Sequence, residues 1–258
     1  MGFKKAFITG ASSGLGRGLS LHYARAGATV YAAARRRAEL ESLAAEAAAA
    51  GAAGRVVPLV LDVADAEAQV AAIARAEEES GGLDLVIANA GVRTPTPGRS
   101  LDWAEVKRIL DINVSAACVT LSAALPALIA RGRGTVAAVS SLAAFLGLPG
   151  RAAYSASKAA LHIFMESLRV DLRKTGVRAV TIYPGYVKTE MTATNERAMP
   201  FVMELDTAVE VMARGLARGQ PTIAYPLPMV AMVKAAAALP GPIWEALAAT
   251  LPFTRPPK

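Results

Sequence analysis

Tyr154 and Lys158 are the residues whose types and spacing most directly suggest chemistry. They lie four residues apart at the start of a helical pattern over 154–175, so both side chains share one helix face. A phenol with a pKa of about 10 transfers protons poorly at neutral pH, and a nearby ammonium favours its ionised form. The pair therefore predicts a tyrosine tuned for proton transfer, although the same spacing also occurs on ordinary surface helices.

A second candidate site is the run Gly10-Ala11-Ser12-Ser13-Gly14-Leu15-Gly16, between an apolar stretch and a helical pattern. Glycines here let the backbone turn tightly and approach a pyrophosphate, whose charge meets the amides and dipole of the helix N-terminus. The spacing, Gly-x-x-x-Gly-x-Gly, differs from the commoner Gly-x-Gly-x-x-Gly. It favours a dinucleotide site over an ordinary glycine-rich turn.

The same residues also fit Gly-x-Ser-x-Gly, the nucleophile elbow of esterases. That chemistry needs an acid and then a histidine downstream of Ser12, and the chain has only His22 and His162. His22 falls in the helix that the loop opens, and His162 in a helix expected to be packed. An elbow after the first strand would also leave few preceding strands for a hydrolase sheet. The sequence therefore favours the nucleotide loop.

Three arginines follow the second predicted strand, in the run Ala33-Ala34-Arg35-Arg36-Arg37, and no acid occurs before Glu39. An acid at this position binds a ribose 2′-hydroxyl, whereas an arginine accommodates a 2′-phosphate. Basic residues in the first turn of a helix also oppose its dipole, which supports a ligand-related reason for them. The run predicts NADP rather than NAD, while Arg37 in particular also fits a solvated helix start.

Apolar runs alternate with helical patterns along the whole chain, which is typical of βαβ units. Strands are expected at 5–9, 29–34, 55–61, 85–88, 135–140, 177–183 and 222–225, and helices near 14–26, 38–50, 66–80, 103–131, 154–175 and 207–218. No linker divides them. We therefore expect one α/β domain over 1–258, a Rossmann-type doubly wound parallel sheet of about seven strands with helices on both faces.

Composition excludes several classes of protein. The chain has 258 residues, of which 53% are hydrophobic and 19% are charged, so it can bury enough apolar surface to offset the entropy lost on folding. This composition excludes an intrinsically disordered protein. Its formal charge of +7 comes entirely from residues 1–38, because the remainder holds 21 basic and 21 acidic residues. No long basic face with aromatic readers appears, which argues against nucleic acid and for a small anionic ligand.

Cysteine content and the start of the chain bear on its location. A lone Cys118 cannot form an internal disulfide, so nothing indicates an oxidising compartment. The apolar stretch after Lys5 is too short for a signal peptide. We therefore expect a cytoplasmic protein.

Taken together, these motifs resemble the classical short-chain dehydrogenase/reductase (SDR) family, over almost all of residues 3–226. Further matching positions follow the third to sixth predicted strands in order: Asp62-Val63, Asn89-Ala90-Gly91, Ser140-Ser141 and Pro184-Gly185. Asn113, within the helix expected over 103–131, also matches the family. Ser141 precedes Tyr154 by 13 residues and Asn113 precedes it by 41, as the family pattern requires.

The resemblance implies roles for four catalytic residues. Tyr154 would exchange a proton with the substrate oxygen, and Lys158 would lower the tyrosine pKa and bind the nicotinamide ribose. Ser141, rather than its neighbour Ser140, would polarise the substrate carbonyl. Asn113 would hold a water that links Lys158 to solvent.

The resemblance also implies the cofactor contacts, and it implies no metal. The expected contacts to the phosphates of NADP(H) are Gly10, Ser12, Ser13, Gly14, Leu15 and Gly16, those to the 2′-phosphate are Arg35 and Arg36, and those to the adenine are Asp62 and Val63. Three residues, Asn89, Ala90 and Gly91, would pack along the cofactor and stabilise the central sheet. The remaining expected cofactor contacts are Tyr154 and Lys158, together with Pro184, Gly185, Val187 and Thr189, which would flank the nicotinamide.

Substrate choice in such folds belongs to loops beyond the carboxyl ends of the strands. Segments 142–151 and 186–205 are rich in apolar residues, which indicates a ketone, aldehyde or secondary alcohol on an apolar, lipid-like or steroid-like body. The same residues would equally serve to close a lid or fill core. Two other functions remain open: a 3-oxoacyl thioester reductase, and an inactive protein that senses NADP.

The C-terminal extension, 226–258, departs from the shorter family members. Its apolar part, 226–252, is interrupted by Lys234, Glu245 and prolines, so it falls short of the roughly 20 apolar residues that span a bilayer. Three roles remain open for it: peripheral contact with a membrane, a cover over the substrate mouth, or a subunit contact. The resemblance implies a homodimer or homotetramer packed through the helices near 103–131 and 154–175.

Overall fold

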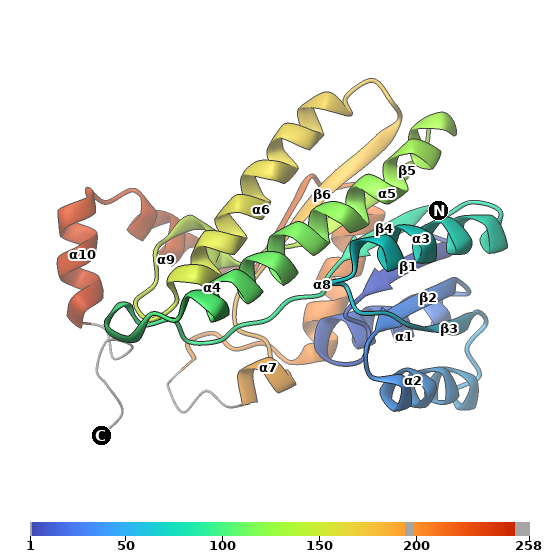
Figure 1. Ribbon diagram of the computed structural model, residues 1–258, viewed down its shortest axis with the longest axis horizontal. Helices are drawn as coiled ribbons and strands as arrows, with labels where there is room; N and C mark the ends of the chain where they lie inside the picture. The colour runs from blue at the N-terminus through green and yellow to red at the C-terminus, as the bar shows by residue number, and fades with distance from the viewer. Residues whose placement is uncertain (1, 194–198, 251–258) are drawn as a thin grey trace.

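A seven-stranded parallel sheet lies between two layers of helices in the computed structural model, which describes residues 2–193 and 199–250 (Figure 1). The strands are β1 (Lys5–Thr9), β2 (Thr29–Ala34), β3 (Arg55–Val60), β4 (Leu85–Ala88), β5 (Gly134–Val139), β6 (Val177–Pro184) and β7 (Thr222–Tyr225). Their order is β3-β2-β1-β4-β5-β6-β7. The order reverses between β1 and β4, and ligands of such sheets bind in the crevice beyond the carboxyl ends at that point.

Ten α-helices connect and cover these strands in the described part of the chain. They are α1 (Gly14–Arg25), α2 (Arg37–Ala49), α3 (Ala66–Ser80), α4 (Trp103–Leu110), α5 (Ala116–Ala130), α6 (Ala152–Asp171), α7 (Glu190–Ala193), α8 (Leu205–Ala217), α9 (Leu227–Ala237) and α10 (Gly241–Thr250). Short 3₁₀ turns occupy Gly98–Ser100 and Leu142–Phe145.

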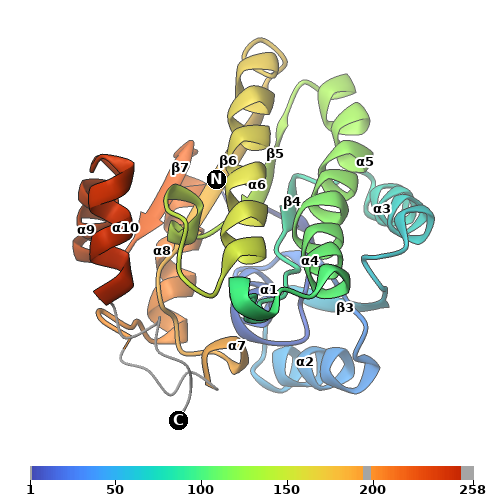
Figure 2. The same cartoon turned by 60° about the vertical axis from the view of Figure 1, so that its left-hand side comes forward.

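Both faces of the sheet are buried because successive strand residues point to opposite sides. On β1, Ile8 joins the core under α1, α2 and α8, and its neighbour Phe7 joins the core under α3, α5 and α6. Figure 2 shows these helices around the sheet. All three strand residues Ala6, Phe7 and Ile8 are fully buried. The continuous apolar strands seen in the sequence are therefore those of a sheet covered on both faces, as predicted.

The helix expected over 103–131 is divided. A π-helical turn, Asp111–Ser115, separates α4 from α5 and places the buried Asn113 within it. Single π turns of this kind often occur at functional sites. The sequence predicted one continuous helix here because neither glycine nor proline interrupts residues 103–125.

Residues 103–130 are also long and apolar enough, by length and composition, to cross a membrane. Leu121, Ala124 and Leu128 of this stretch are buried in the core between the sheet and its neighbouring helices. The stretch therefore serves as a core helix of this fold.

The C-terminal extension forms two helices that lie beside each other near β7 (Figures 1 and 2). Met229 and Val230 of α9 pack on the small core around Tyr183. On α10, the Trp244 indole donates a hydrogen bond to the Gly147 carbonyl at 3.3 Å. The extension thus contacts the loop after β5 that borders the site described next, and its last residues, 251–258, lie outside the described part.

Candidate active site

A cavity of about 510 Å³ opens at the carboxyl ends of the strands, where the strand order reverses. Its volume is in the range of small-molecule and cofactor sites. Nearly all predicted site residues line it: Gly10, Ser12, Ser13, Gly14, Leu15, Arg35, Arg36, Asp62, Val63, Asn89, Ala90, Gly91, Ser141, Tyr154, Lys158, Pro184, Gly185, Val187 and Thr189. Gly16 and Asn113 do not line it.

The glycine loop forms one wall of this cavity. Gly10 and Gly14 have positive φ angles of 67° and 52°, which glycine adopts without strain. A Cβ on Gly10 would lie 2.8 Å from Ala90 Cα, so β1 and β4 can approach here only without a side chain. Ser13 begins α1 without a side-chain capping bond, and no acid lies in the first turn. The loop therefore offers backbone amides to an anion.

Gly16 has a packing role rather than a cavity-facing one. A Cβ there would lie 2.4 Å from the Gly10 carbonyl and 2.5 Å from Asn89 Nδ2. The Asn89 amide itself donates to the carbonyl of Thr9 at 2.9 Å, and Thr9 Oγ1 accepts from the Asn89 and Ala90 amides. These bonds fix the ends of β1 and β4 against each other, which the resemblance implied for Asn89.

Arginines stand at one end of the cavity. Arg36 Nε donates to Ser12 Oγ at 3.1 Å, and Arg36 Nη1 forms an ion pair with Glu190 at 3.1 Å. Arg35 is exposed and lines the cavity. Arg37 does not line it and pairs with Glu41 on its own helix, as the solvated alternative predicts.

Tyr154 and Lys158 extend from the first two turns of α6 at the other end of the cavity. Lys158 Nζ lies 5.8 Å from the centre of the Tyr154 ring and donates to the Val139 carbonyl at 2.8 Å. Burial lowers the pKa of Lys158 to about 8. A buried ammonium beside a phenol is the juxtaposition that the spacing predicted.

The electrostatics of Tyr154 differ in detail from the expectation. Burial raises the pKa of its phenol, while a hydrogen bond with Ser141 and the charges of Arg93 and Arg151 act in the opposite direction. Lys158 is not among the groups that shift this pKa, so a lowering by Lys158 stays a prediction. The protonated phenol is thus favoured at neutral pH, and this form can donate a proton.

Ser140 and Ser141 directly follow β5, and their hydroxyls have different hydrogen-bond partners. Ser140 is buried, and its hydroxyl donates to the Lys158 carbonyl at 2.9 Å. Ser141 Oγ accepts from the Ala143 amide at 3.2 Å and bonds with Tyr154. The hydroxyl beside the phenol is therefore that of Ser141, in agreement with the sequence-based preference.

Asn113 is fully buried behind the cavity. Its Oδ1 accepts from the Val92 amide at 2.8 Å, and its Nδ2 donates to the Val92 carbonyl and to Ser157 Oγ, each at 3.0 Å. Both amide hydrogens are thus used by protein partners. The side chain positions the loop after β4, and the expected water relay stays a prediction.

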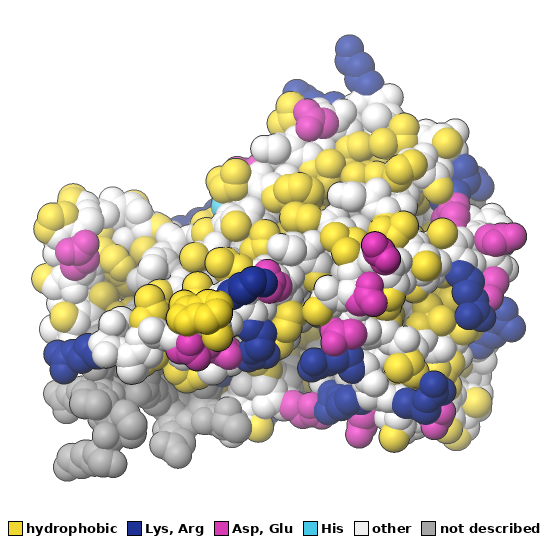
Figure 3. Space-filling view, in the orientation of Figure 1, with side chains coloured by type: hydrophobic (Ala, Val, Ile, Leu, Met, Phe, Trp, Pro, Cys, Tyr) yellow, Lys and Arg dark blue, Asp and Glu magenta, His cyan; other side chains and the backbone are white. Residues whose placement is uncertain are grey.

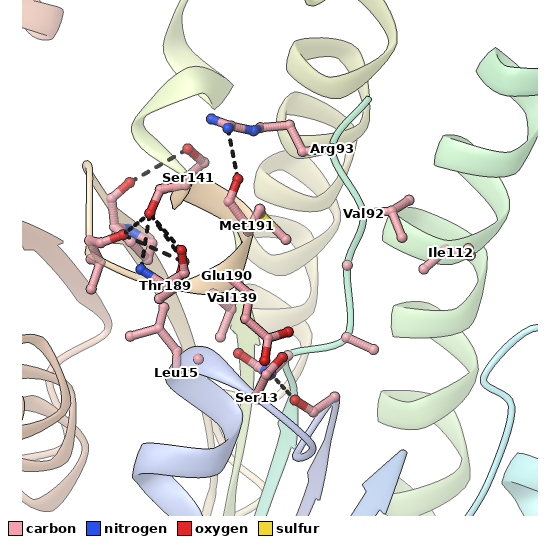
Figure 4. Close-up of a pocket in the computed structure, with 18 of the residues that line it drawn as sticks. Ser13, Leu15, Val92, Arg93, Ile112, Val139, Ser141, Thr189, Glu190 and Met191 are labelled. Atoms are coloured by element: carbon pink, nitrogen blue, oxygen red, sulfur yellow. Dashed lines mark hydrogen bonds between the residues drawn. The ribbon is translucent and has the colours of Figure 1, made fainter. Parts of the chain in front are cut away.

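Three charged residues that the sequence reading did not assign also line the cavity: Arg93, Arg151 and Glu190. Arg93 Nη2 donates to the Met191 carbonyl at 2.9 Å, which links the loop after β4 to α7 (Figure 4). Glu190 reaches from α7 toward Ser13 in the same view. No local pattern marks these residues, because their loops meet only in the folded chain.

The esterase alternative is not supported by this geometry. Ser12 Oγ bonds to Arg36, and neither His22 nor His162 lines the cavity. His162 Nδ1 bonds instead to the Tyr183 hydroxyl at 2.5 Å. No histidine is therefore placed to activate Ser12.

This fold and this site define a dinucleotide-binding α/β enzyme, and the comparisons agree. The family model described as short chain dehydrogenase matches residues 4–200. An uncharacterized oxidoreductase from Myxococcus xanthus is 52% identical over 251 residues, 97% of this chain and 98% of the relative. The chain belongs to the short-chain dehydrogenase/reductase family, whose members are oxidoreductases that use nicotinamide cofactors.

Solved structures give the same result. A short-chain type dehydrogenase/reductase from Mycobacterium marinum is 28% identical with a TM-score of 0.77, covering 86% of this chain and 92% of that one. An alcohol dehydrogenase from the archaeon Thermococcus sibiricus, complexed with 5-hydroxy-NADP, is 25% identical with a TM-score of 0.77, covering 86% and 95%.

Proposed function

We propose that this protein is an NADP(H)-dependent oxidoreductase that reduces a carbonyl, or oxidises the matching secondary alcohol, on an apolar substrate. The observation that carries the proposal is the arrangement of one cavity. Arg35 and Arg36 stand at one end, and Ser141, Tyr154 and Lys158 stand at the other. A phosphorylated dinucleotide extended along the glycine loop would place its two ends at these two groups.

The residues fit a nicotinamide dinucleotide. The glycine loop and the uncapped start of α1 would hold the pyrophosphate, and Pro184, Gly185 and Thr189 would border the nicotinamide. When bound, the cofactor supplies or accepts a hydride. The protein supplies orientation and the separate proton.

Tyr154 supplies the proton in this proposal. In reduction, its hydroxyl donates to the substrate oxygen as that oxygen gains negative charge, and Ser141 donates a second hydrogen bond to the same oxygen. Arg93 and Arg151 favour the resulting phenolate, because their charges lower the pKa of Tyr154. Lys158 then adds a positive charge close to the ring.

Cofactor choice rests on the arginines. Arg35 lines the cavity and, among the described residues, forms no hydrogen bond or ion pair, so its guanidinium is available to a 2′-phosphate. The Thermococcus alcohol dehydrogenase with its NADP derivative adds support from a similar structure.

Apolar side chains in the cavity wall support an apolar substrate body. They include Ile112, Leu142, Leu148, Met191 and Met229. Met229 comes from the C-terminal extension, which supports one of its three expected roles, that of a cover over the substrate mouth. Residues 194–198 of the substrate loop lie outside the described part.

A homo-oligomer in the cytoplasm completes the proposal. The face of α5 and α6 carries hydrophobic side chains across its surface in Figure 3, and its exposed residues include Ile129, Ile163 and Val170. Exposed apolar patches mark contacts with other proteins or with membranes, and we assign this face to a contact between subunits. Size-exclusion chromatography with light scattering would test this part, and a monomer at micromolar concentration would contradict it.

Turnover with a substrate panel tests the main proposal. The purified protein is given NADPH or NADH with apolar ketones, aldehydes, a steroid and an acetoacetyl thioester, and loss of the reduced nicotinamide is followed by absorbance. We expect turnover with NADPH on apolar carbonyls. Preference for the thioester would make the protein a 3-oxoacyl thioester reductase, and tight NADPH binding without any turnover would make it a nucleotide sensor.

A further inference from the structure

Glu190 places a carboxylate at the arginine end of the cavity. It is the first residue of α7, and its Oε2 lies 3.1 Å from Arg36 Nη1. Arg36 Nε at the same time donates to Ser12 Oγ. Glu190, Arg36 and Ser12 all line the cavity, so the ion pair belongs to the site itself.

This carboxylate is unusual in its surroundings. Among the described residues that line the cavity, only Asp62 and Glu190 are acidic, against four arginines and Lys158. A 2′-phosphate bound to Arg36 would share that guanidinium with Glu190, and the two anions would repel each other at close range. A cofactor with a 2′-hydroxyl would meet no such repulsion.

The backbone that carries Glu190 is held in place by several bonds. Thr192 Oγ1 donates to the Val187 carbonyl at 2.7 Å and accepts from the Thr189 amide at 2.9 Å. Arg93 Nη2 bonds to the next carbonyl along, that of Met191 (Figure 4). These bonds fix the backbone of α7, so the Glu190 carboxylate stays near the arginines even when rotation of its side chain breaks the ion pair with Arg36.

We propose that Glu190 is a specificity-determining residue, whose carboxylate competes with the 2′-phosphate of the cofactor for Arg36 and so narrows the preference for NADP(H) over NAD(H). The inference rests on the proposed function, because it takes the arginine end as the seat of the adenosine ribose. Glu190 opposes Arg35 and Arg36, and the balance among the three sets the cofactor ratio.

The test uses two probes that differ by one group, 2′,5′-ADP and 5′-ADP, with binding measured by calorimetry. Glu190→Gln keeps the shape of the side chain and removes its charge. We expect it to bind 2′,5′-ADP about fivefold more tightly and 5′-ADP within about twofold of the wild type, since both partners are partly exposed. The difference should shrink in high salt.

Glu204→Gln is the matched control. Glu204 is 65% exposed against 64% for Glu190, it also forms an ion pair, with Lys188, and it does not line the cavity. We expect its affinities for both probes to stay within about twofold of the wild type, because Glu204 lies outside the cavity and makes no ion pair with Arg35 or Arg36.

Three results would overturn the inference: unchanged or weaker binding of 2′,5′-ADP by Glu190→Gln, equal tightening of both probes, or the same tightening in Glu204→Gln. Binding of 5′-ADP by each variant shows that the nucleotide site is folded. The turnover panel separates the two proposals, since a protein without turnover can still show the probe difference, and an active protein can lack it.

Discussion

Asn113 Nδ2 donates a hydrogen bond to Ser157 Oγ at 3.0 Å, and this bond joins the π-helical turn to α6 one residue before Lys158. Ser157 Oγ in turn donates to the Tyr154 carbonyl at 2.7 Å. Both side chains are fully buried. The π-helical turn is therefore joined to α6, which carries Tyr154 and Lys158, by two buried side chains that do not themselves line the cavity.

Asn113→Ala tests that role. It leaves the Val92 amide and carbonyl and Ser157 Oγ without their partner, so we expect the free energy of unfolding to fall by about 3 kcal/mol. Urea denaturation measures it. Ser157→Ala, which removes one partner of the amide, should cost about 1 kcal/mol. A loss below about 1 kcal/mol in Asn113→Ala would contradict the positioning role.

Tyr154→Phe removes the hydroxyl that donates the proton. We expect turnover to fall by about 10²–10⁴-fold while NADPH affinity stays within about threefold of the wild type. Steady-state kinetics and fluorescence titration give the two values. Tyr225→Phe is the control, because Tyr225 is buried, does not line the cavity, and its hydroxyl has no hydrogen-bond partner among the described residues. Unchanged turnover in Tyr154→Phe would dismiss the role.

Ser141→Ala and Ser140→Ala separate two adjacent hydroxyls. Loss of the Ser141 hydroxyl removes a bond to Tyr154 and a donor for the substrate oxygen, so we expect kcat to fall by about 10²-fold. Ser140→Ala instead removes a bond to the Lys158 carbonyl, and should cost about 1 kcal/mol of stability with a smaller loss of kcat. The reverse order of kcat values would reassign the role to Ser140.

Lys158 makes stability depend on pH in a defined direction. Its folded pKa is about 8 and its ordinary value is 10.5, so between these values the unfolded chain binds a proton that the folded chain has lost. Stability from this residue therefore rises with pH across that window, by about 3 kcal/mol in full. Below about pH 8, Lys158 is charged in both the folded and the unfolded chain, so the cost of burying its charge reduces the free energy of unfolding in full.

Lys158→Met isolates this contribution, because other groups also titrate in the same range. We expect the free energy of unfolding of the wild type to gain on that of the variant as pH rises from 8 toward 10.5. Chemical denaturation at a series of pH values measures the difference. Parallel curves for the two proteins would show that the Lys158 pKa is not lowered.

Arg35→Asp reverses the charge at the expected 2′-phosphate contact. We expect NADPH affinity to fall by about 10–100-fold and NADH affinity to stay within about threefold, since a carboxylate suits a ribose hydroxyl. Arg37→Asp changes the same charge in the same arginine run, outside the cavity, and should alter neither by more than about threefold. Equal weakening of both cofactors by Arg35→Asp would remove the basis for NADP selection.

The strands and most residues of the candidate site could be predicted from the sequence because local features encode them. Buried strands appear as apolar runs, and Tyr154 with Lys158 is a helical spacing that needs no other element. The glycine loop is likewise local, since its positive φ angles require glycine in the sequence itself.

Other parts depend on contacts between distant segments. Arg93 and Arg151 lie in two separate loops and Glu190 begins α7, and only the folded sheet brings them to one cavity. The π turn at Asn113 has no separate sequence signal, because neither glycine nor proline interrupts residues 103–125. The two helices of the C-terminal extension were not predicted, because prolines interrupt its apolar pattern. Pro228 and Pro242 lie at the starts of α9 and α10, where proline is compatible with a helix.

The residues that line the cavity come from different elements of the fold, and this arrangement has an evolutionary consequence. The residues proposed for proton transfer and nucleotide contact lie at strand ends, on α6 and in the segment between β6 and α8, whereas the described part of the C-terminal extension reaches the cavity through Met229 of α9. Duplicated genes could therefore diverge in the compounds they handle by exchanging the final two helices. The inherited reaction would persist, because that exchange leaves the proposed machinery in place.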